Sequence, residues 1–131
     1  MERNPAPNVN LIAAVGPKGE LGFKGGLPWE DKEDLAWFRK MTMGDVVIMG
    51  SATYWNVAEH LDGRYCIRFS REGMFKGDIP SLIKNFEQQT IWVAGGARTY
   101  EAWIPYVRRS FITHIGYSGP SDTRMPGLWT S

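Results

Sequence analysis

The chain has 131 residues, of which 43% are hydrophobic and 22% charged, and its formal net charge is +1. This length fits one domain that buries roughly two-thirds of the surface of its unfolded chain. The near-neutral charge, without any basic run, argues against a nucleic-acid-binding protein. The apolar runs are too short to span a membrane, so no membrane partner is expected.

Cysteine and histidine are scarce in the sequence. Cys66 is the only cysteine, which excludes an internal disulfide and fits a reducing cytoplasm. The two histidines, His60 and His114, give no ligand spacing for a structural zinc site, so no metal is expected. The opening residues MERNPAPN contain no signal-peptide core. These features together predict a cytoplasmic protein.

The first third of the chain predicts an arm, a strand, a loop and a helix. Residues 1–8 are polar with two prolines, and we expect a flexible arm before one domain over 9–131. The continuous apolar run VNLIAAV (9–15) predicts a buried strand. GPKGELGFKGGLP (16–28) predicts a long mobile loop, a kind of loop that is usually functional. An amphipathic helix should follow, with Asp31 as its N-cap.

The rest of the chain alternates between strands and helices. Strands are predicted at VVIMG (46–50), YCIRFS (65–70), IWVAGG (91–96) and FITHIGY (111–117). Helices are predicted over 51–57, from Pro80 through Phe86, and over ARTYEAWI, which Pro105 should end. This alternation predicts an α/β fold, a single domain with a largely parallel central sheet flanked by helices.

One carboxylate lies on the apolar face of the first predicted helix. At about 100° per residue, Asp34 falls in the middle of the face formed by Leu35, Trp37, Phe38 and Met41. An unpaired buried carboxylate costs several kcal/mol. A salt bridge with Arg64 or a role at the helix start would remove that cost. A ligand would also do so, which makes Asp34 a candidate site residue.

Two predicted strands end in glycines and hydroxyl residues. Gly95 and Gly96 follow one strand, and Gly50 leads into Ser51 and Thr53 after another. In open α/β sheets, ligands bind beyond the carboxyl ends of the strands, where glycine lets them approach the backbone. A tight turn would explain the glycine pair alone, and the GxGxxG pattern is absent. Two such ends in one sheet suit the two halves of a dinucleotide.

Four further polar residues lie at strand positions that suit a ligand. Ser70 and Arg71 follow the third strand, where they could hold an additional phosphate. Arg64 begins that strand and could bind a carboxylate with both arms of its guanidinium. Thr113 alternates with apolar neighbours and should be half-buried. Taken singly, Arg64 and Arg71 are better explained as surface arginines, and Thr113 as a strand hydroxyl bonded to backbone.

The motifs together resemble the dihydrofolate reductase family of bacterial or bacteriophage type. LIAAV, LPW-x4-DLAWF, VIMG-x2-T, L-x-GR, VAGGARTYE, THI and SDT-x2-P follow in the family's order and spacing, from residue 9 to about 126. The resemblance implies NADPH-dependent reduction of 7,8-dihydrofolate to 5,6,7,8-tetrahydrofolate by hydride transfer to the pterin ring. It also implies inhibition by antifolates.

The resemblance assigns roles to the residues found above. The catalytic group would be Asp34, Trp29 and Thr113, with Asp34 accepting hydrogen bonds from the pterin. The remaining substrate-binding residues would be Ile12, Leu27, Phe38, Val57, Leu61 and Arg64. Cofactor-binding residues would be Ala14, Leu21, Gly50, Ser51, Ala52, Thr53, Ser70, Arg71, Gly95, Gly96, Ala97, Arg98, Thr99 and Tyr100. The family also implies a cis peptide bond between Gly95 and Gly96.

The sequence departs from the family pattern in two respects. Ser51 stands where a basic residue commonly helps bind the adenosine 2′-phosphate, whereas Arg71 stands where a small hydroxyl residue is common. The family also continues with a hairpin beside the strand 111–117, and this chain ends at Ser131. That strand is therefore expected at an exposed edge, where a homodimer could form.

Two alternative functions remain open on the sequence. The fold could be kept as a low-activity or non-catalytic folate- or NADP-binding or structural protein. It could also be another NADPH-dependent reductase, such as the pyrimidine reductase of riboflavin synthesis. The pairing of Asp34 with Arg64 favours a pterin with a glutamate tail.

Overall fold

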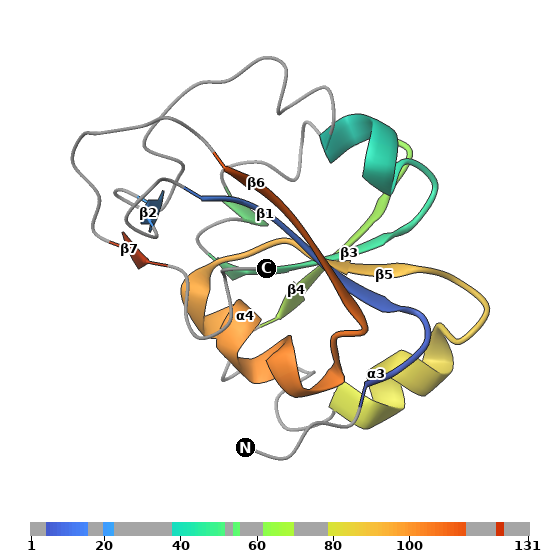
Figure 1. Cartoon of the computed structure of the whole chain (residues 1–131). Helices are drawn as coiled ribbons and strands as arrows, with labels where there is room; N and C mark the ends of the chain where they lie inside the picture. Colours follow the sequence, from blue (N-terminus) through green and yellow to red (C-terminus); the bar gives the residue numbers. More distant parts are fainter. Residues whose placement is uncertain are drawn as a thin grey trace.

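The computed structural model describes residues 5–15, 20–22, 38–51, 54–55, 62–69, 79–114 and 123–124. Its main feature is a five-stranded sheet with the strand order β4-β3-β5-β1-β6 (Figure 1). The strands are β1 (Val9–Val15), β3 (Val46–Gly50), β4 (Tyr65–Phe69), β5 (Ile91–Val93) and β6 (Arg109–His114). A second, two-stranded sheet joins β2 (Glu20–Gly22) to β7 (Thr123–Arg124).

All neighbouring strands of the main sheet are parallel. In the register, β1 pairs with β5 through Val9 and Ile91, and with β6 through Asn10 and Arg109. β3 pairs with β4 on one side and with β5 on the other. Since all five strands run the same way, their carboxyl ends meet at one edge of the sheet. The predicted parallel α/β architecture is confirmed.

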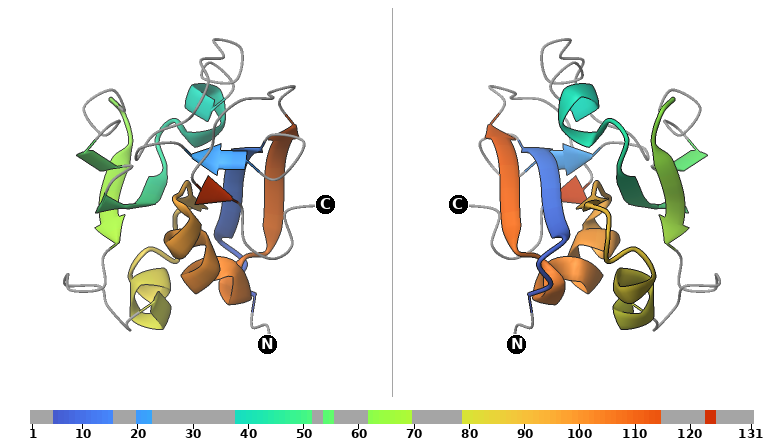
Figure 2. Two further views of the ribbon diagram at one scale, coloured as in Figure 1. Left: turned by 90° about the vertical axis from the view of Figure 1, so that its left-hand side faces the viewer. Right: turned by 90° about the vertical axis from the view of Figure 1, so that its right-hand side faces the viewer.

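The two faces of the sheet carry different packing. Alternation along β3 directs Val46 and Ile48 into one cluster, and Val47 and Met49 into the other; all four side chains are fully buried. The larger cluster includes Leu82 and Trp103 and other residues of the two helices described next. The smaller one packs against Phe38, Tyr54, Cys66 and Ala94. The helices therefore cover one face, and the helical residues 38–42 lie over the other (Figure 2).

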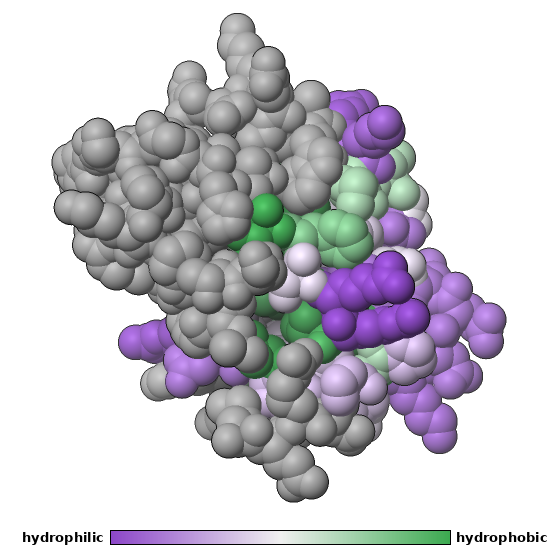
Figure 3. Space-filling view, viewed as in Figure 1, coloured by the Kyte–Doolittle hydropathy of each residue, from purple (hydrophilic) through white to green (hydrophobic). Residues whose placement is uncertain are grey.

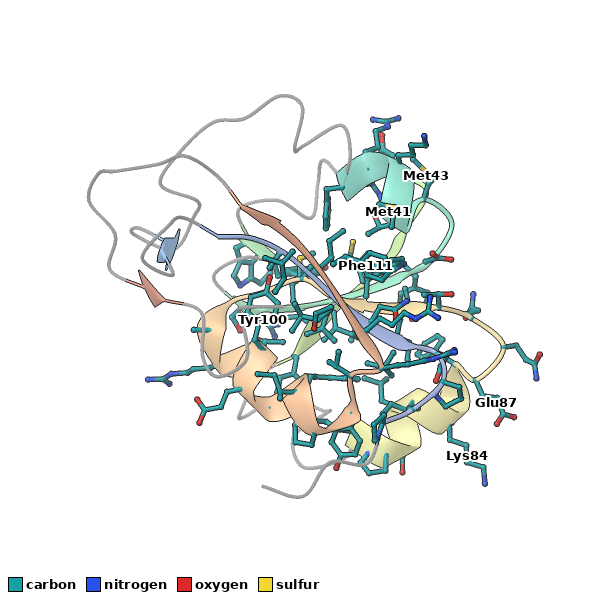
Figure 4. The ribbon with its side chains drawn as sticks, viewed as in Figure 1. Met41, Met43, Lys84, Glu87, Tyr100 and Phe111 are labelled. Atoms are coloured by element: carbon teal, nitrogen blue, oxygen red, sulfur yellow. The ribbon has the colours of Figure 1, made fainter. Side chains whose placement is uncertain are left out.

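Two short helices cover the face of the sheet that carries the larger hydrophobic cluster. Helix α3 (Ile79–Asn85) has Pro80 in its first turn, where a missing N–H costs no hydrogen bond. Helix α4 (Ala97–Trp103) continues into the 3-10 turn η2 (Ile104–Tyr106), which contains Pro105. On the outside of α3, Lys84 and the following Glu87 point away from the sheet (Figure 4), and this surface is hydrophilic (Figure 3).

Several predicted elements are confirmed with shifted bounds. β5 ends at Val93 rather than residue 96, because the following glycines turn the chain away from the sheet. β6 begins two residues earlier than predicted, at Arg109. The segment 16–28, predicted as a loop throughout, contains strand β2 paired with β7. Most of the helix predicted from Asp31, and part of the one over 51–57, lie outside the described residues.

The described part of the N-terminal arm is hydrogen-bonded to the domain. The N–H of Ala6 donates to the carbonyl of Tyr106 at 2.9 Å. The Asn8 side chain donates to the carbonyls of Phe86 and Gln89 at 3.0 and 3.2 Å. These contacts tie residues 6 and 8 to the ends of η2 and α3. A domain boundary at residue 9 stays a prediction.

Among the described residues, no helix combines the length and apolar character needed to cross a membrane.

Candidate active site

The carboxyl ends of β3 and β5 meet through backbone alone. The N–H of Gly50 donates to the carbonyl of Gly95 at 2.7 Å, and the Gly95–Gly96 peptide bond is cis. Gly95 has a φ of 118°, in the region that favours glycine. The cis bond expected from the family resemblance is confirmed. The two glycine-bearing strand ends singled out in the sequence are therefore in contact.

The approach is too close for a side chain at Gly50. A Cβ at this position would lie 2.8 Å from Oγ1 of Thr99 and 3.6 Å from the backbone nitrogen of Gly96. Thr99 is itself buried, with 3% of its surface exposed. Glycine at position 50 therefore lets the end of β3 touch the first turn of α4.

Helix α4 starts directly at this junction. Its N-cap, Gly96, has no side chain to accept from the first-turn N–H groups of Ala97, Arg98 and Thr99. Arg98 is exposed and Tyr100 is 2% exposed. The hydroxyl of Tyr100 donates to the carbonyl of Ile12 at 2.8 Å, reaching from α4 to β1 (Figure 4). The start of α4 thus follows the cis Gly95–Gly96 bond directly, and the Tyr100 hydrogen bond ties this helix to β1.

Arg64 is placed by a pair of left-handed glycines. Gly44 and Gly63 have φ values of 81° and 80°, and the N–H of Gly44 donates to the carbonyl of Gly63 at 2.9 Å. The next bond along, from the N–H of Tyr65 to the carbonyl of Asp45, starts the pairing of β3 with β4. Arg64 therefore lies where β4 begins, beside the end of the helical residues 38–42.

The charge of Arg64 lies in a partly desolvated, basic environment. Burial lowers the pKa of Arg64, and the neighbouring positive charge of Arg39 acts in the same direction, while Cys66 and Asp62 raise it. The guanidinium stays charged at neutral pH. Burial raises the pKa of the Cys66 thiol, and the charge of Arg64 opposes this. The guanidinium of Arg39 and the carboxylate of Asp62 thus act on Arg64 in opposite directions.

Phe38 and Ile12 are the described members of the predicted apolar wall. Phe38 packs against Val47 and Met49 on the smaller face of the sheet. Ile12, on β1, is 2% exposed. Beside β1, Phe111 on β6 and Trp92 on β5 make an edge-to-face contact with ring centroids 5.3 Å apart.

The predicted site residues are only partly covered by the structure. Nine lie outside the described residues: Leu27, Trp29, Asp34, Ala52, Thr53, Val57, Leu61, Ser70 and Arg71. Ala14, Leu21 and Thr113 are described by backbone only, and Ala14 pairs with Thr113 across β1 and β6. Gly50, Ser51, Gly95, Gly96, Ala97, Arg98, Thr99 and Tyr100 gather around the junction of β3, β5 and α4.

One polar residue beside the site was missed in the sequence. Thr42 is completely buried, and its hydroxyl contacts Arg64. Its position four residues after Phe38, on the same helical face, was the available signal. A threonine near a helix end is so common that this signal alone did not single it out.

The family model for dihydrofolate reductase matches residues 8–131. The chain belongs to the dihydrofolate reductase family. A dihydrofolate reductase of Buchnera aphidicola subsp. Acyrthosiphon pisum is 32% identical over 127 residues, which cover 91% of this chain and 79% of that relative. A dihydromethanopterin reductase of Methylorubrum extorquens is 30% identical over 128 residues, 93% of either chain.

A solved structure agrees with this family membership at the level of the fold. The dihydrofolate reductase from Enterococcus faecalis, complexed with NADP(H) and RAB-propyl, superimposes with a TM-score of 0.80. The match covers 92% of this chain and 77% of that one, at 21% identity. The sheet order described above is therefore that of a dihydrofolate reductase fold, in a family of oxidoreductases.

Proposed function

We propose that this protein reduces 7,8-dihydrofolate to 5,6,7,8-tetrahydrofolate with NADPH as hydride donor. The observation that carries the proposal is the hydrogen bond between Gly50 and Gly95, where the ends of two strands meet beside the start of α4. Because the chain belongs to the dihydrofolate reductase family, we assign this junction to the binding of the cofactor. The free cysteine, Cys66, is consistent with a reducing cytoplasm as the compartment.

The residues at the junction fit a dinucleotide cofactor. A Cβ at Gly50 would meet Oγ1 of Thr99, so glycine at this position lets the end of β3 and the start of α4 lie side by side. The first turn of α4 supplies N–H donors, and Ser51 supplies a hydroxyl at the end of β3. When bound, NADPH supplies the hydride. We assign Ala52, Thr53, Ser70 and Arg71 to the same role from the sequence, with Arg71 binding the 2′-phosphate.

The nicotinamide end of the cofactor site is assigned to β1 and α4. Tyr100, fixed by its hydrogen bond to Ile12, lies beside the central strand. Ala14 and Leu21 complete this part of the proposed site. Holding the two reactants in one orientation is the main contribution a protein makes to a hydride transfer.

The pterin is assigned to the opposite side of β1. We propose that Asp34 accepts two hydrogen bonds from the ring N–H and 2-amino groups, that Thr113 supports this carboxylate, and that Trp29 holds a water. The apolar walls are Ile12, Leu27, Phe38, Val57 and Leu61. Arg64, a charged group in a basic environment, binds the α-carboxylate of the glutamate tail. A diaminopyrimidine antifolate presents a similar donor pair to Asp34 and should inhibit.

The proton that completes the reaction goes to the ring nitrogen beside the reduced carbon. Asp34 anchors the far side of the ring, so its negative charge favours protonation without delivering the proton itself. Water is the proposed donor. The protein residues therefore act by orientation and by charge.

A homodimer through β6 is the proposed assembly. In the described part of the chain, β6 pairs with β1 and lies at the edge of the sheet, where its backbone can pair with a second strand. Arg109 and Ser110 at its start are exposed. Sedimentation equilibrium should give twice the monomer mass, and a monomer at assay concentration contradicts this assembly.

The test of function is NADPH oxidation with dihydrofolate, followed by the loss of NADPH absorbance, in the wild type, Asp34→Asn and Glu87→Gln. The control residue Glu87 is an exposed carboxylate beyond α3, pointing away from the site (Figure 4). Wild type and control should turn over equally. Asp34→Asn should lose roughly ten- to hundredfold in kcat/KM, the value of a hydrogen bond to a charged group. Replacing NADPH by NADH tests the assignment of Arg71.

Two outcomes would contradict the proposal. A folded wild type without turnover would favour the non-catalytic folate- or NADP-binding reading. Equal rates for wild type and Asp34→Asn would remove Asp34 from the site.

A second candidate substrate, suggested by one of the relatives, should be tested in the same assay. The dihydromethanopterin reductase relative aligns over 93% of its own length, a larger share than the 79% of the Buchnera relative. Dihydromethanopterin, the compound in the name of that relative, is therefore the alternative substrate. Faster turnover of dihydromethanopterin than of dihydrofolate would select this alternative.

A further inference from the structure

Strand β4 forms one edge of the main sheet in the described part of the chain (Figure 2). The N–H of Tyr65 donates to the carbonyl of Asp45 at 3.0 Å, so the backbone groups of Tyr65 and of every second residue after it face β3. The N–H and C=O groups of the residues between them, Cys66 and Arg68, therefore point to the outer side. Such a row of backbone groups can pair with a further strand.

Large hydrophobic side chains are exposed along this edge. Three are exposed in the part of the chain that the structure describes: Met43, Trp55 and Tyr65, with 42%, 69% and 61% of their surface. Tyr65 belongs to β4 itself. Trp55 lies under Arg68 of the same strand, with the guanidinium carbon 5.3 Å from the ring centroid. The sulfur of Met43 lies against Gly63, just before β4. Single exposed hydrophobic residues are ordinary, whereas a group of them beside one sheet edge marks an interaction surface.

The two sides of β4 differ in chemistry. Cys66 packs against the smaller hydrophobic cluster, so Arg68, two residues further on, lies on the same side of the strand. Tyr65 lies on the side of the larger cluster, where its ring meets that of Phe86 edge to face at 5.7 Å. The side chains of an added strand alternate in the same way, one set beside Arg68 and the other beside Tyr65. The partner that fits is therefore a strand with alternating acidic and apolar residues.

The charge of β4 favours an acidic partner over a second copy of this chain. Arg68 is exposed, and a carboxylate beside it would gain a charge-assisted hydrogen bond. A guanidinium donates in its own plane, so stacking on Trp55 is compatible with such a bond. Near the start of the strand, Arg39 and Arg64 contribute positive charge and Asp62 negative charge. A second copy would bring its own Arg68 to the same edge, where like charges oppose pairing.

We propose that β4 is a docking edge for an extended acidic segment of another protein, which adds to the sheet as a further strand. Backbone hydrogen bonds to Cys66 and Arg68 hold the segment. Its carboxylates face Arg68, and its apolar side chains cover Tyr65. The proposal is independent of the reductase function, because it concerns none of the residues assigned to substrate or cofactor.

The test is an NMR titration of the isotope-labelled protein with two blocked peptides, acetyl-EVEVEVE-amide and acetyl-KVKVKVK-amide. The wild type should bind the glutamate peptide with a dissociation constant below about 1 mM, and the lysine peptide at least about tenfold more weakly. The shifted amide signals should be those of residues 64–69. A third peptide, acetyl-EEEEVVV-amide, has the composition of the first without its alternation and should bind at least about tenfold more weakly.

Two charge reversals form a matched pair. Arg68→Glu and Lys84→Glu change the net charge equally, and Lys84 is exposed on the outside of α3, pointing away from the sheet (Figure 4). Arg68→Glu should weaken the glutamate peptide at least about tenfold and bind the lysine peptide better than the wild type does. Lys84→Glu should change either affinity by less than about threefold. Arg68→Pro removes an outward N–H and should abolish binding of both peptides. If Arg68→Pro fails to fold, the non-alternating peptide tests strand pairing in its place.

Four results would overturn the proposal. Absence of binding at about 1 mM glutamate peptide would show that Arg68 only protects the edge from pairing. Shifted signals away from β4, or equal binding of alternating and non-alternating peptides, would exclude an added strand. Equal effects of Arg68→Glu and Lys84→Glu would reduce the binding to general charge attraction. A wild-type dimer that Arg68→Glu converts to a monomer in sedimentation equilibrium would assign this edge to a second copy of the chain.

Discussion

The contact between Gly50 and Thr99 should make Gly50→Ala costly. The new Cβ would lie 2.8 Å from Oγ1 of Thr99, whereas ordinary contact begins at 3.4 Å. Thr99 is 3% exposed and stiff at χ1, so its hydroxyl cannot turn away into solvent. The end of β3 must therefore move away from α4. Such overpacking costs about 1–3 kcal/mol, of which the lower entropy of the unfolded alanine chain offsets about 0.4–1 kcal/mol.

Urea unfolding of four proteins measures this clash. The proteins are the wild type, Gly50→Ala, Thr99→Ala and the double variant. Gly50→Ala should lower the free energy of unfolding by about 1–2 kcal/mol, a shift of roughly 1 M in the urea midpoint. In the Thr99→Ala background, where Oγ1 is gone, the same substitution should cost at least about 1 kcal/mol less.

Two results would refute this reasoning. An equal cost of Gly50→Ala in both backgrounds would show that Thr99 is not the atom in the way. A neutral or stabilising Gly50→Ala would show that β3 and α4 do not approach as closely as described.

Five further substitutions test the core, a turn and a partly buried thiol. Trp103→Phe removes a buried Nε1 for which the described structure contains no acceptor. Trp92→Phe removes an Nε1 that donates to the carboxylate of Asp45 at 2.8 Å. Calorimetry should therefore show that Trp92→Phe lowers the free energy of unfolding by about 1 kcal/mol more than Trp103→Phe does. Gly63→Ala and Gly44→Ala both place alanine at a φ near 80°, costing about 1–2 kcal/mol, but only at Gly63 does the Cβ meet a sulfur, at 2.6 Å, so Gly63→Ala should unfold at lower urea. The raised pKa of Cys66 contributes stability that is complete below the unfolded thiol pKa of about 8.5 and is lost as pH rises through the folded pKa, so Cys66→Ala should flatten the decline in stability above about pH 8. Equal costs within either pair, or an unchanged pH slope, would contradict the respective argument.

The central strands were predictable because burial on both faces leaves a continuous apolar run. Val46 through Met49 are all fully buried, as the pattern VVIM indicates. The same holds for the start of β1 at Val9. In these segments the local sequence pattern and the buried position in the fold both favour a strand, so the sequence alone was sufficient to predict it.

The sheet edge and the small second sheet depend on partners distant in sequence. β6 begins at Arg109 and Ser110, which are exposed, and their strand conformation comes from pairing with Asn10 and Leu11 of β1. β2, with three residues, exists through its pairing with β7. Neither the start of β6, at Arg109 and Ser110, nor β2 has an apolar period that would indicate a strand.

In the candidate site, too, features visible in the local sequence could be predicted and contacts between distant residues could not. Gly50 and Gly95 could be singled out because glycines at strand ends are visible in the sequence, and their contact confirms that the two ends converge. The contact of Thr42 with Arg64 could not be predicted, because it joins residues on separate elements through one long hydrogen bond. Sequence motifs thus located the junction of Gly50 and Gly95 better than the contact between Thr42 and Arg64.

The place of β1 in the sheet has a kinetic consequence. β1 contains residues 9–15 and pairs with β5 at 91–93 and with β6 at 109–114. During synthesis this strand leaves the ribosome with a hydrophobic sequence and without these partners, and its pairing waits until residues 91–114 have been made. Folding of the sheet is therefore late, and a parallel topology of such distant contacts is expected to fold in milliseconds to seconds. Until then, the exposed apolar segment 9–15 is the part of the nascent chain that a chaperone would bind.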